Sequence, residues 1–195
     1  MKRKCKPLIV SLLFTVHCSL FTILCSLFIA CEAETPVSRK YGCQFVFDCE
    51  KHPTSLLIAA VRNPGSYVYV TTTGDGASTV RHVYVTSNDG KTPREDNIIR
   101  TDRENLTSCV LGASNSIGLF IGLTNFNGLW AYDRSCPNCA NLQAMDFTGN
   151  RQKVICPKCH RIYDLETGAI VDGENGDPLM RYYCSFDGTI IHAWN

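Results

Sequence analysis

Four cysteines in the C-terminal third of the chain form two similar pairs. Cys136 and Cys139 lie in the run CPNC, and Cys156 and Cys159 lie in the run CPKC. A Cys-X-X-Cys turn points two thiolates at one ion, and a second such turn completes a tetrahedral all-sulfur site. The proline helps to fix each turn because its φ angle is already set. The spacing therefore predicts one metal centre shared by both pairs. The alternative is one or two disulfides in an exported protein.

The identity of the metal is a separate question, because four thiolates suit more than one metal group. They bind Zn²⁺, a single iron or a [2Fe–2S] cluster. Zinc at this spacing would make a zinc ribbon without redox chemistry, whereas iron would carry electrons. His160 directly follows the second pair. We expect it not to be a ligand, because four sulfurs already fill the site.

The sequence after the second pair resembles that of Rieske-type domains. In that family, Cys-Pro-X-His is followed by Tyr or Phe and Asp, a Thr-Gly turn, Pro-Leu and a closing hairpin with Asp-Gly at its tip. The corresponding residues here are Cys156 to Cys159, Tyr163-Asp164, Thr167-Gly168, Pro178-Leu179 and Asp187-Gly188. The run from Gly122 to Asp133 also resembles the strands that lead into the first cluster loop of the family. The resemblance covers the chain from about residue 118 to residue 195.

The resemblance implies an antiparallel β sandwich or barrel of Rieske-like type, with a metal-binding subdomain like that of rubredoxin or a zinc ribbon. Cys136 and Cys156 stand where the family has ligand cysteines, and Cys139 and Cys159 stand where it has ligand histidines. Four thiolates carry more negative charge, so a [2Fe–2S] cluster here would have a low potential, like a plant-type ferredoxin. The implied function is electron transfer to an unidentified redox protein. The alternative is a non-redox binding or structural lipoprotein with a four-cysteine zinc site.

A targeting segment precedes the domain. Residues 1–6 carry four basic side chains, and residues 7–30 contain no Asp, Glu, Lys or Arg. Because the apolar run ends in Ala30-Cys31, we expect a bacterial lipoprotein signal with Cys31 as the lipidated residue. The alternative is an uncleaved anchor, since the run is long enough to span a bilayer. Either arrangement tethers the protein to a bacterial membrane in the cell envelope, on the periplasmic or outer-surface side.

Behind the signal, we expect a linker at residues 31–40 and one all-β domain at residues 41–195, with the metal-binding loops at 135–164. About 155 residues suit a single core. Short β-branched and aromatic runs alternate with Gly, Asn and Asp turns, which is typical of an antiparallel sandwich or barrel. The expected strands are Gln44 to Asp48, Tyr67 to Thr73, Thr79 to Thr86, Gly118 to Thr124 and Leu129 to Tyr132. Residues 56–61 fit either a strand or a helix, and residues 91–105 read as a loop.

Four more cysteines lie in the domain outside the two pairs: Cys43, Cys49, Cys109 and Cys184. An even number in an exported domain allows disulfides, with three possible pairings. Buried free thiols are the alternative, because cysteine is readily buried as a small hydrophobic residue.

Composition argues against other kinds of site. The net charge is +1, and no basic stripe is interleaved with aromatics, which argues against nucleic acid as a partner. No Gly-rich phosphate loop and no recognisable Ser/His/Asp set occurs. An electron carrier or a binding protein is therefore favoured over a stand-alone enzyme.

Overall fold

The computed structural model describes residues 36–73, 80–100, 102–104 and 108–195. The expected signal segment and Cys31 lie outside these residues. The described residues belong to the compact unit Thr35–Asn195 and form antiparallel strands with one α-helix and one 3₁₀ helix. None of the helices in this part of the chain is long and apolar enough to cross a membrane. The prediction of an antiparallel all-β domain is confirmed.

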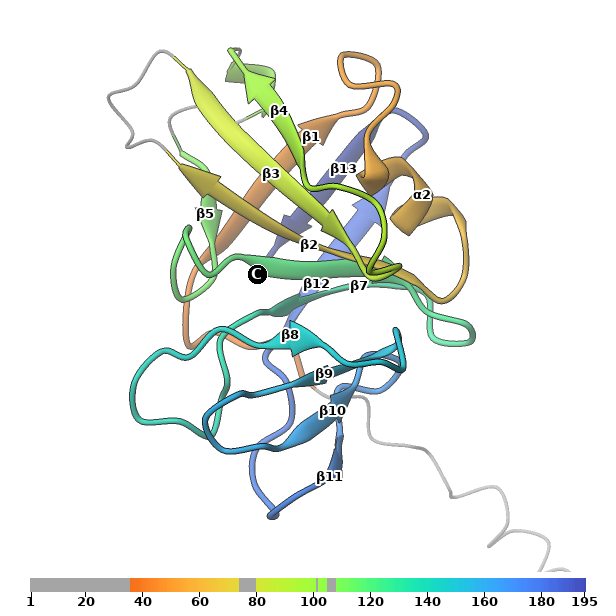
Figure 1. Cartoon of the computed structure of the whole chain (residues 1–195). Coiled ribbons are helices and arrows are strands. Elements are labelled where there is room, and N and C mark those ends of the chain that lie inside the picture. The colour runs from red at the N-terminus through yellow and green to blue at the C-terminus, as the bar shows by residue number, and fades with distance from the viewer. Residues whose placement is uncertain (1–35, 74–79, 101, 105–107) are drawn as a thin grey trace, which may run out of the picture. The chain divides into compact units, whose positions relative to one another are not determined.

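The larger sheet has nine strands in the order β4-β3-β2-β6-β7-β12-β13-β1-β5 (Figure 1). They are β1 (Cys43–Asp48), β2 (Ser66–Thr73), β3 (Arg81–Ser87), β4 (Glu95–Ile99), β5 (Val110–Leu111), β6 (Leu119–Leu123), β7 (Leu129–Asp133), β12 (Arg181–Phe186) and β13 (Ile190–Trp194). Strands from both ends of this order contribute side chains to one core, for example Val83 of β3 and Phe45 of β1. The sheet therefore curls around a single hydrophobic core.

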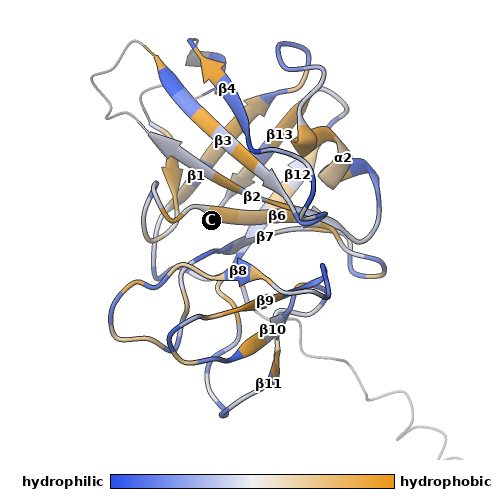
Figure 2. Ribbon diagram, viewed as in Figure 1, coloured by the Kyte–Doolittle hydropathy of each residue, from blue (hydrophilic) through white to orange (hydrophobic). Residues whose placement is uncertain are grey.

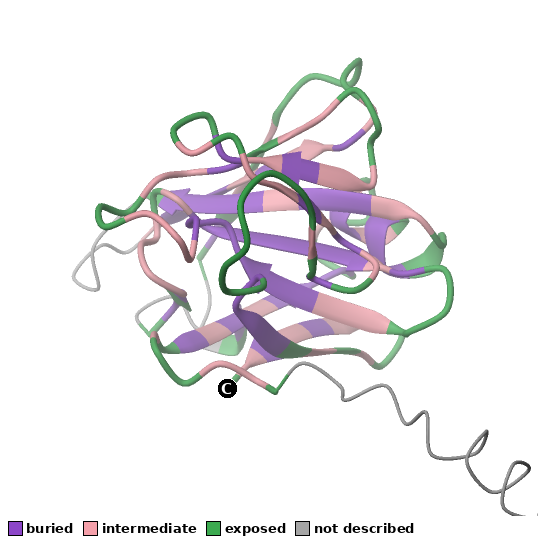
Figure 3. Ribbon diagram, turned by 90° about the horizontal axis from the view of Figure 1, so that it is seen from below, coloured by how far each residue is buried: buried purple, intermediate pink, exposed green. Residues whose placement is uncertain are grey.

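Strands β2, β6 and β7 contribute side chains to buried clusters on both of their faces. Of the three, β6 is the most hydrophobic (Figure 2). Side chains alternate between faces along a strand. In β2, Val68 and Val70 point into the main core, whereas Tyr67 belongs to a second cluster on the outer face. Figure 3 shows the resulting buried band across the sheet.

The smaller sheet supplies the cover on that outer face. Its order is β11-β10-β9-β8, formed by β8 (Asp146–Phe147), β9 (Lys153–Ile155), β10 (Ile162–Asp164) and β11 (Ile170–Asp172). Val154 and Tyr163 of this sheet are fully buried and share the second cluster with Phe120 of β6. The two sheets are thus joined by an apolar interface.

Two segments differ from the simplest interpretation of the sequence. Residues 56–61 fall in helix α2 (Leu56–Arg62), because Ser55 caps it and Glu95 accepts a hydrogen bond from Leu56 N at 2.9 Å. The prediction of a loop at residues 91–105 is wrong, because this stretch contains β4 and the 3₁₀ helix η1 (Asp102–Glu104). Strand β4 is a polar strand at the end of the sheet, and Ile99 is its fully buried side chain. Its sequence therefore lacks the hydrophobic pattern of an inner strand.

Residues just before β1 lie against the domain. Val37 forms a parallel bridge with Arg181, and Ser38 N donates to Arg181 O at 2.8 Å. Asn195 Nδ2 donates to Ser38 O at 2.8 Å and to Tyr41 O at 2.7 Å. The last part of the expected linker is therefore bonded to the domain.

Candidate metal centre

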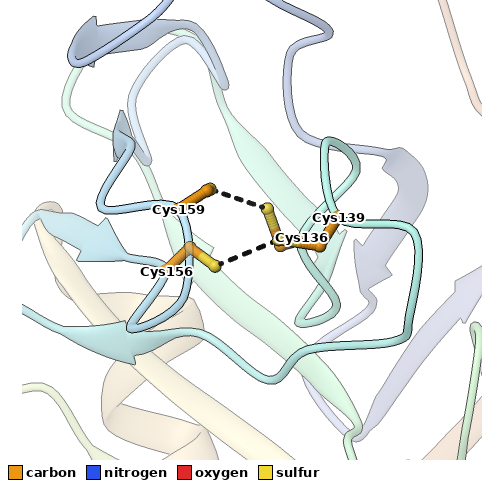
Figure 4. Close-up of side chains that lie close together, drawn as sticks. All are labelled: Cys136, Cys139, Cys156 and Cys159. Atoms are coloured by element: carbon orange, nitrogen blue, oxygen red, sulfur yellow. Dashed lines mark hydrogen bonds between the residues drawn. The ribbon is translucent and has the colours of Figure 1, made fainter.

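The four cysteines of the two pairs lie together at one end of the smaller sheet (Figure 4). We call Cys136–Cys139 the first knuckle and Cys156–Cys159 the second knuckle. All four Sγ atoms lie within 4.8 Å of one another. Two sulfur contacts join the knuckles: Cys136 Sγ to Cys159 Sγ and Cys139 Sγ to Cys156 Sγ, both 3.6 Å. Four sulfurs bound to one zinc at about 2.3 Å would be separated by about 3.8 Å in a tetrahedron. The donor set and its spacing therefore fit one metal ion.

The first knuckle begins where β7 leaves the larger sheet. Asp133 is fully buried, and its Oδ1 accepts a hydrogen bond from Ser135 N at 2.7 Å. Cys136 N then donates to Gln143 O at 2.8 Å, which closes the loop that carries this knuckle. Arg134 holds the far side of the loop, because its Nε donates to Met145 O at 2.8 Å. The first knuckle is therefore fixed by buried polar contacts to the larger sheet.

The second knuckle is the turn of the β9–β10 hairpin. Cys156 N donates to Arg161 O at 3.0 Å, and His160 N donates to Cys156 O at 2.9 Å. His160 has a φ angle of 60°, the left-handed conformation that a tight turn requires after its last residue. Its side chain is exposed, and the group of four possible ligands does not include it.

The electrostatic environment differs among the sulfurs. Burial raises the pKa of Cys136, and burial together with the neighbouring sulfurs raises the pKa of Cys139 to about 12. At Cys159, burial also opposes ionisation, but hydrogen bonds from Arg161 and the adjacent thiols outweigh it and lower the pKa to about 6. Three or four thiolates in this space need a positive charge between them, which a metal ion supplies.

Three polar side chains lie beside the sulfurs, and two of them tie the knuckles to the segment before β12. The hydroxyl of Tyr163 lies 3.5 Å from Cys136 Sγ and accepts a hydrogen bond from Asn138 Nδ2 at 2.9 Å. Asn138 also pairs with the backbone of Asp177, at 2.8 Å and 2.9 Å. Arg161 Nε donates to Glu174 O at 2.9 Å. Residues 174–177 are therefore bonded to both knuckles, and we call them the strap.

Several residues of the run after the second knuckle have local structural roles. Gly168 has a φ angle of 78°, and its N donates to Asp164 O at 2.8 Å. Leu179 is buried and its N donates to Gly168 O at 2.8 Å. Asp187 Oδ1 accepts from Thr189 N and closes the β12–β13 turn. These contacts account for the residue types at these positions.

The other four domain cysteines lie apart from the centre, in the core of the larger sheet. Cys43, Cys49, Cys109 and Cys184 are free thiols, and no disulfide joins the described cysteines. In the strand register, Cys43 is opposite Leu111 and Cys184 is opposite Ala193. The structure therefore has buried or half-buried thiols where disulfides were a possibility.

The sequence did not single out Asn138 or Arg161 as neighbours of the sulfurs. Both side chains bond to the strap, which follows β11 and folds back beside the knuckles. One signal was present: a cation two residues after a ligand cysteine is a candidate donor to its sulfur.

The chain matches no protein-family model, and no curated protein or solved structure matches it.

Proposed function

We propose that this protein is a metal-binding protein in which the four knuckle cysteines hold one ion, and that the ion is Zn²⁺. The observation that carries the proposal is the mutual spacing of the four Sγ atoms, all within 4.8 Å. In a [2Fe–2S] cluster the sulfurs are divided between two irons, which separates one pair from the other. A single tetrahedral ion suits the observed spacing better. Zinc is preferred over ferrous iron because comparable sites bind it more tightly.

In this proposal the zinc has a structural role. It fixes the two knuckles relative to each other and so holds the strap and the end of the smaller sheet as a rigid surface for a binding partner. The smaller sheet also packs against the larger one through the buried side chains of Val154 and Tyr163. Loss of zinc should therefore loosen the knuckles and the strap without unfolding the larger sheet.

We further propose that the domain is of Rieske-like type. Support comes from the sequence run after the second knuckle, in which Tyr163 contacts a sulfur and Gly168 and Leu179 form the turn contacts described above. The second knuckle lies in the β9–β10 hairpin of the smaller sheet, and the first lies in the loop that enters this sheet from β7, which also favours this architecture.

Electron transfer is the second candidate function, with iron bound as one ion or as a [2Fe–2S] cluster. Two observations favour it. Cys139 and Cys159 are only half-buried, so a redox partner could approach the centre closely. Tyr163 and Arg161 also lie close enough to hydrogen-bond to sulfurs, and such bonds tune the potential of iron–sulfur centres.

The N-terminal sequence supports attachment to the membrane of the cell envelope through a lipid on Cys31. A Cys31→Ser variant should remain an unprocessed precursor or appear in the soluble fraction. Unchanged size together with membrane retention of this variant would favour the uncleaved anchor.

Metal analysis of protein made in medium that contains both zinc and iron tests the proposed ion. We expect a colourless protein with one zinc per chain. Cys136→Ser, Cys139→Ser, Cys156→Ser and Cys159→Ser should each remove most of this zinc, and His160→Ala should retain it. Iron near two per chain with visible absorption would support the second candidate. No metal in the wild-type protein would refute both.

A further inference from the structure

The sulfurs of the centre are arranged in two close pairs that cross between the knuckles. Cys136 Sγ lies 3.6 Å from Cys159 Sγ, and Cys139 Sγ lies 3.6 Å from Cys156 Sγ. Each sulfur thus has a partner on the opposite loop at about van der Waals contact.

Each close pair also combines one accessible sulfur with one buried sulfur. Cys139 and Cys159 are half-buried, whereas Cys136 is 3% exposed and Cys156 is fully buried. A small oxidant in solvent therefore reaches Cys139 and Cys159 first. Across the loops, each of these faces a buried sulfur at 3.6 Å.

We propose that the centre is a peroxide-sensitive switch, in which oxidation releases the metal and joins the knuckles through two crossed disulfides, Cys136–Cys159 and Cys139–Cys156. This inference rests on the proposed metal-binding function and adds its regulation. The centre senses the oxidant because the thiolates that hold the ion are the same groups that oxidation consumes.

The chemistry balances with hydrogen peroxide as the oxidant. The Cys159 thiolate attacks one peroxide oxygen, the O–O bond breaks, and hydroxide leaves as Cys159 becomes a sulfenic acid. The Cys136 thiolate then attacks the Cys159 sulfur, the S–S bond forms, and a second hydroxide leaves. Cys139 and Cys156 follow the same two steps with a second peroxide. Four thiolates and two peroxides thus give two disulfides and four hydroxides, and no ligand remains for the ion.

The strap reports this change to the surface. Asn138 lies between the two cysteines of the first knuckle, and Arg161 follows the second knuckle by two residues. Both side chains bond to the strap backbone, at Asp177 and Glu174 respectively. Drawing the sulfurs from 3.6 Å to a bond of about 2.05 Å shifts both anchors, so we expect the strap to move with them.

Peptide mapping of the full-length, reduced and zinc-loaded protein after peroxide treatment tests the pairing. Trypsin cuts after Arg134, Arg151, Lys153, Lys158 and Arg161, which places Cys156 and Cys159 on separate peptides. Crossed disulfides link three peptides, 135–151, 154–158 and 159–161. We expect this three-peptide product together with release of one zinc per chain. A product in which 154–158 is linked only to 159–161 would show pairing within the knuckles and overturn the proposal.

Trapping of sulfenic acids with dimedone identifies the partner of each accessible sulfur. In Cys136→Ser we expect dimedone on Cys159 and none on Cys139. In Cys156→Ser we expect the reverse. Pairing within each knuckle predicts the opposite labels, so that result would overturn the proposal even if both variants lose zinc. A wild-type protein purified without metal would instead refute the proposed function, and its crosslink map would still distinguish pairing between the knuckles from pairing within them.

Discussion

Replacement of Asp133 by asparagine should destabilise the domain more than any change of one exposed charge. Asp133 is fully buried where β7 leads into the first knuckle. Its Oδ1 accepts from Ser135 N at 2.7 Å, and its Oδ2 accepts from Ala113 N at 2.7 Å and from Tyr182 OH at 2.9 Å. Both oxygens of the Asp133 carboxylate act only as hydrogen-bond acceptors, and these bonds join three segments of the chain.

An asparagine keeps the shape but turns one of these oxygens into an N–H₂ donor. The hydroxyl of Tyr182 can rotate to accept from it, but the backbone N–H of Ser135 or of Ala113 cannot. At least one buried N–H is left unpaired, at a cost of about 1–3 kcal/mol. The remaining bonds lose the extra strength that a charged acceptor gives. With both effects, we expect a loss of about 2–4 kcal/mol in the free energy of unfolding.

Urea unfolding followed by tryptophan fluorescence measures this loss. The midpoint should fall while the slope with urea stays unchanged, since the surface exposed on unfolding is the same. Asp146→Asn is the matched control, because Asp146 is largely exposed and pairs with Arg134. It should cost less than about 1 kcal/mol. Equal losses in the two variants would refute the role assigned to Asp133.

Three further predictions concern the turns and the centre. Glu166 accepts hydrogen bonds from the backbone of the β6–β7 turn, and although burial opposes ionisation, these bonds lower its pKa below the ordinary 4.5. The stabilisation is present above pH 4.5 and is lost as pH falls through the lowered pKa. Amide exchange in the turn should therefore speed up at that pH in the wild-type protein, and Glu166→Gln should show no such step. Gly118→Ala should cost more than about 3 kcal/mol in thermal or urea unfolding, because φ is 87° and a Cβ would overlap a backbone oxygen, whereas Gly149→Ala, with open space around it, should be close to neutral. Tyr163→Phe should weaken zinc binding about 10-fold in chelator competition, since it removes the hydroxyl beside Cys136, and unchanged affinity would exclude that contact as a contributor.

The features that the sequence predicted correctly are those that depend on neighbouring residues. The two knuckles could be found because each ligand pair lies within one turn, and the β6–β7 hairpin because Asn127-Gly128 marks its turn. Strand β4 was missed, because a strand at the end of a sheet needs few apolar residues. Helix α2 stayed ambiguous because part of its N-terminal cap comes from Glu95, far along the chain.

The surroundings of the centre could be predicted less well than its ligands. Asn138 and Arg161 contact the strap, and nothing in the local sequence specifies that return of the chain. The position of the smaller sheet also depends on which face of β6 each side chain of that strand points to. Phe120 and Ile121 are equally apolar, yet they belong to different cores.

X-ray absorption spectroscopy of the purified metal-loaded protein tests the central claim most directly, because it reports the ligands and the neighbours of the metal together. We predict a zinc edge with four sulfur neighbours at about 2.3 Å and no second metal nearby. An iron edge with a short iron–iron distance would contradict the single-ion centre and establish a [2Fe–2S] cluster. Nitrogen or oxygen in the first shell would contradict ligation by all four cysteines.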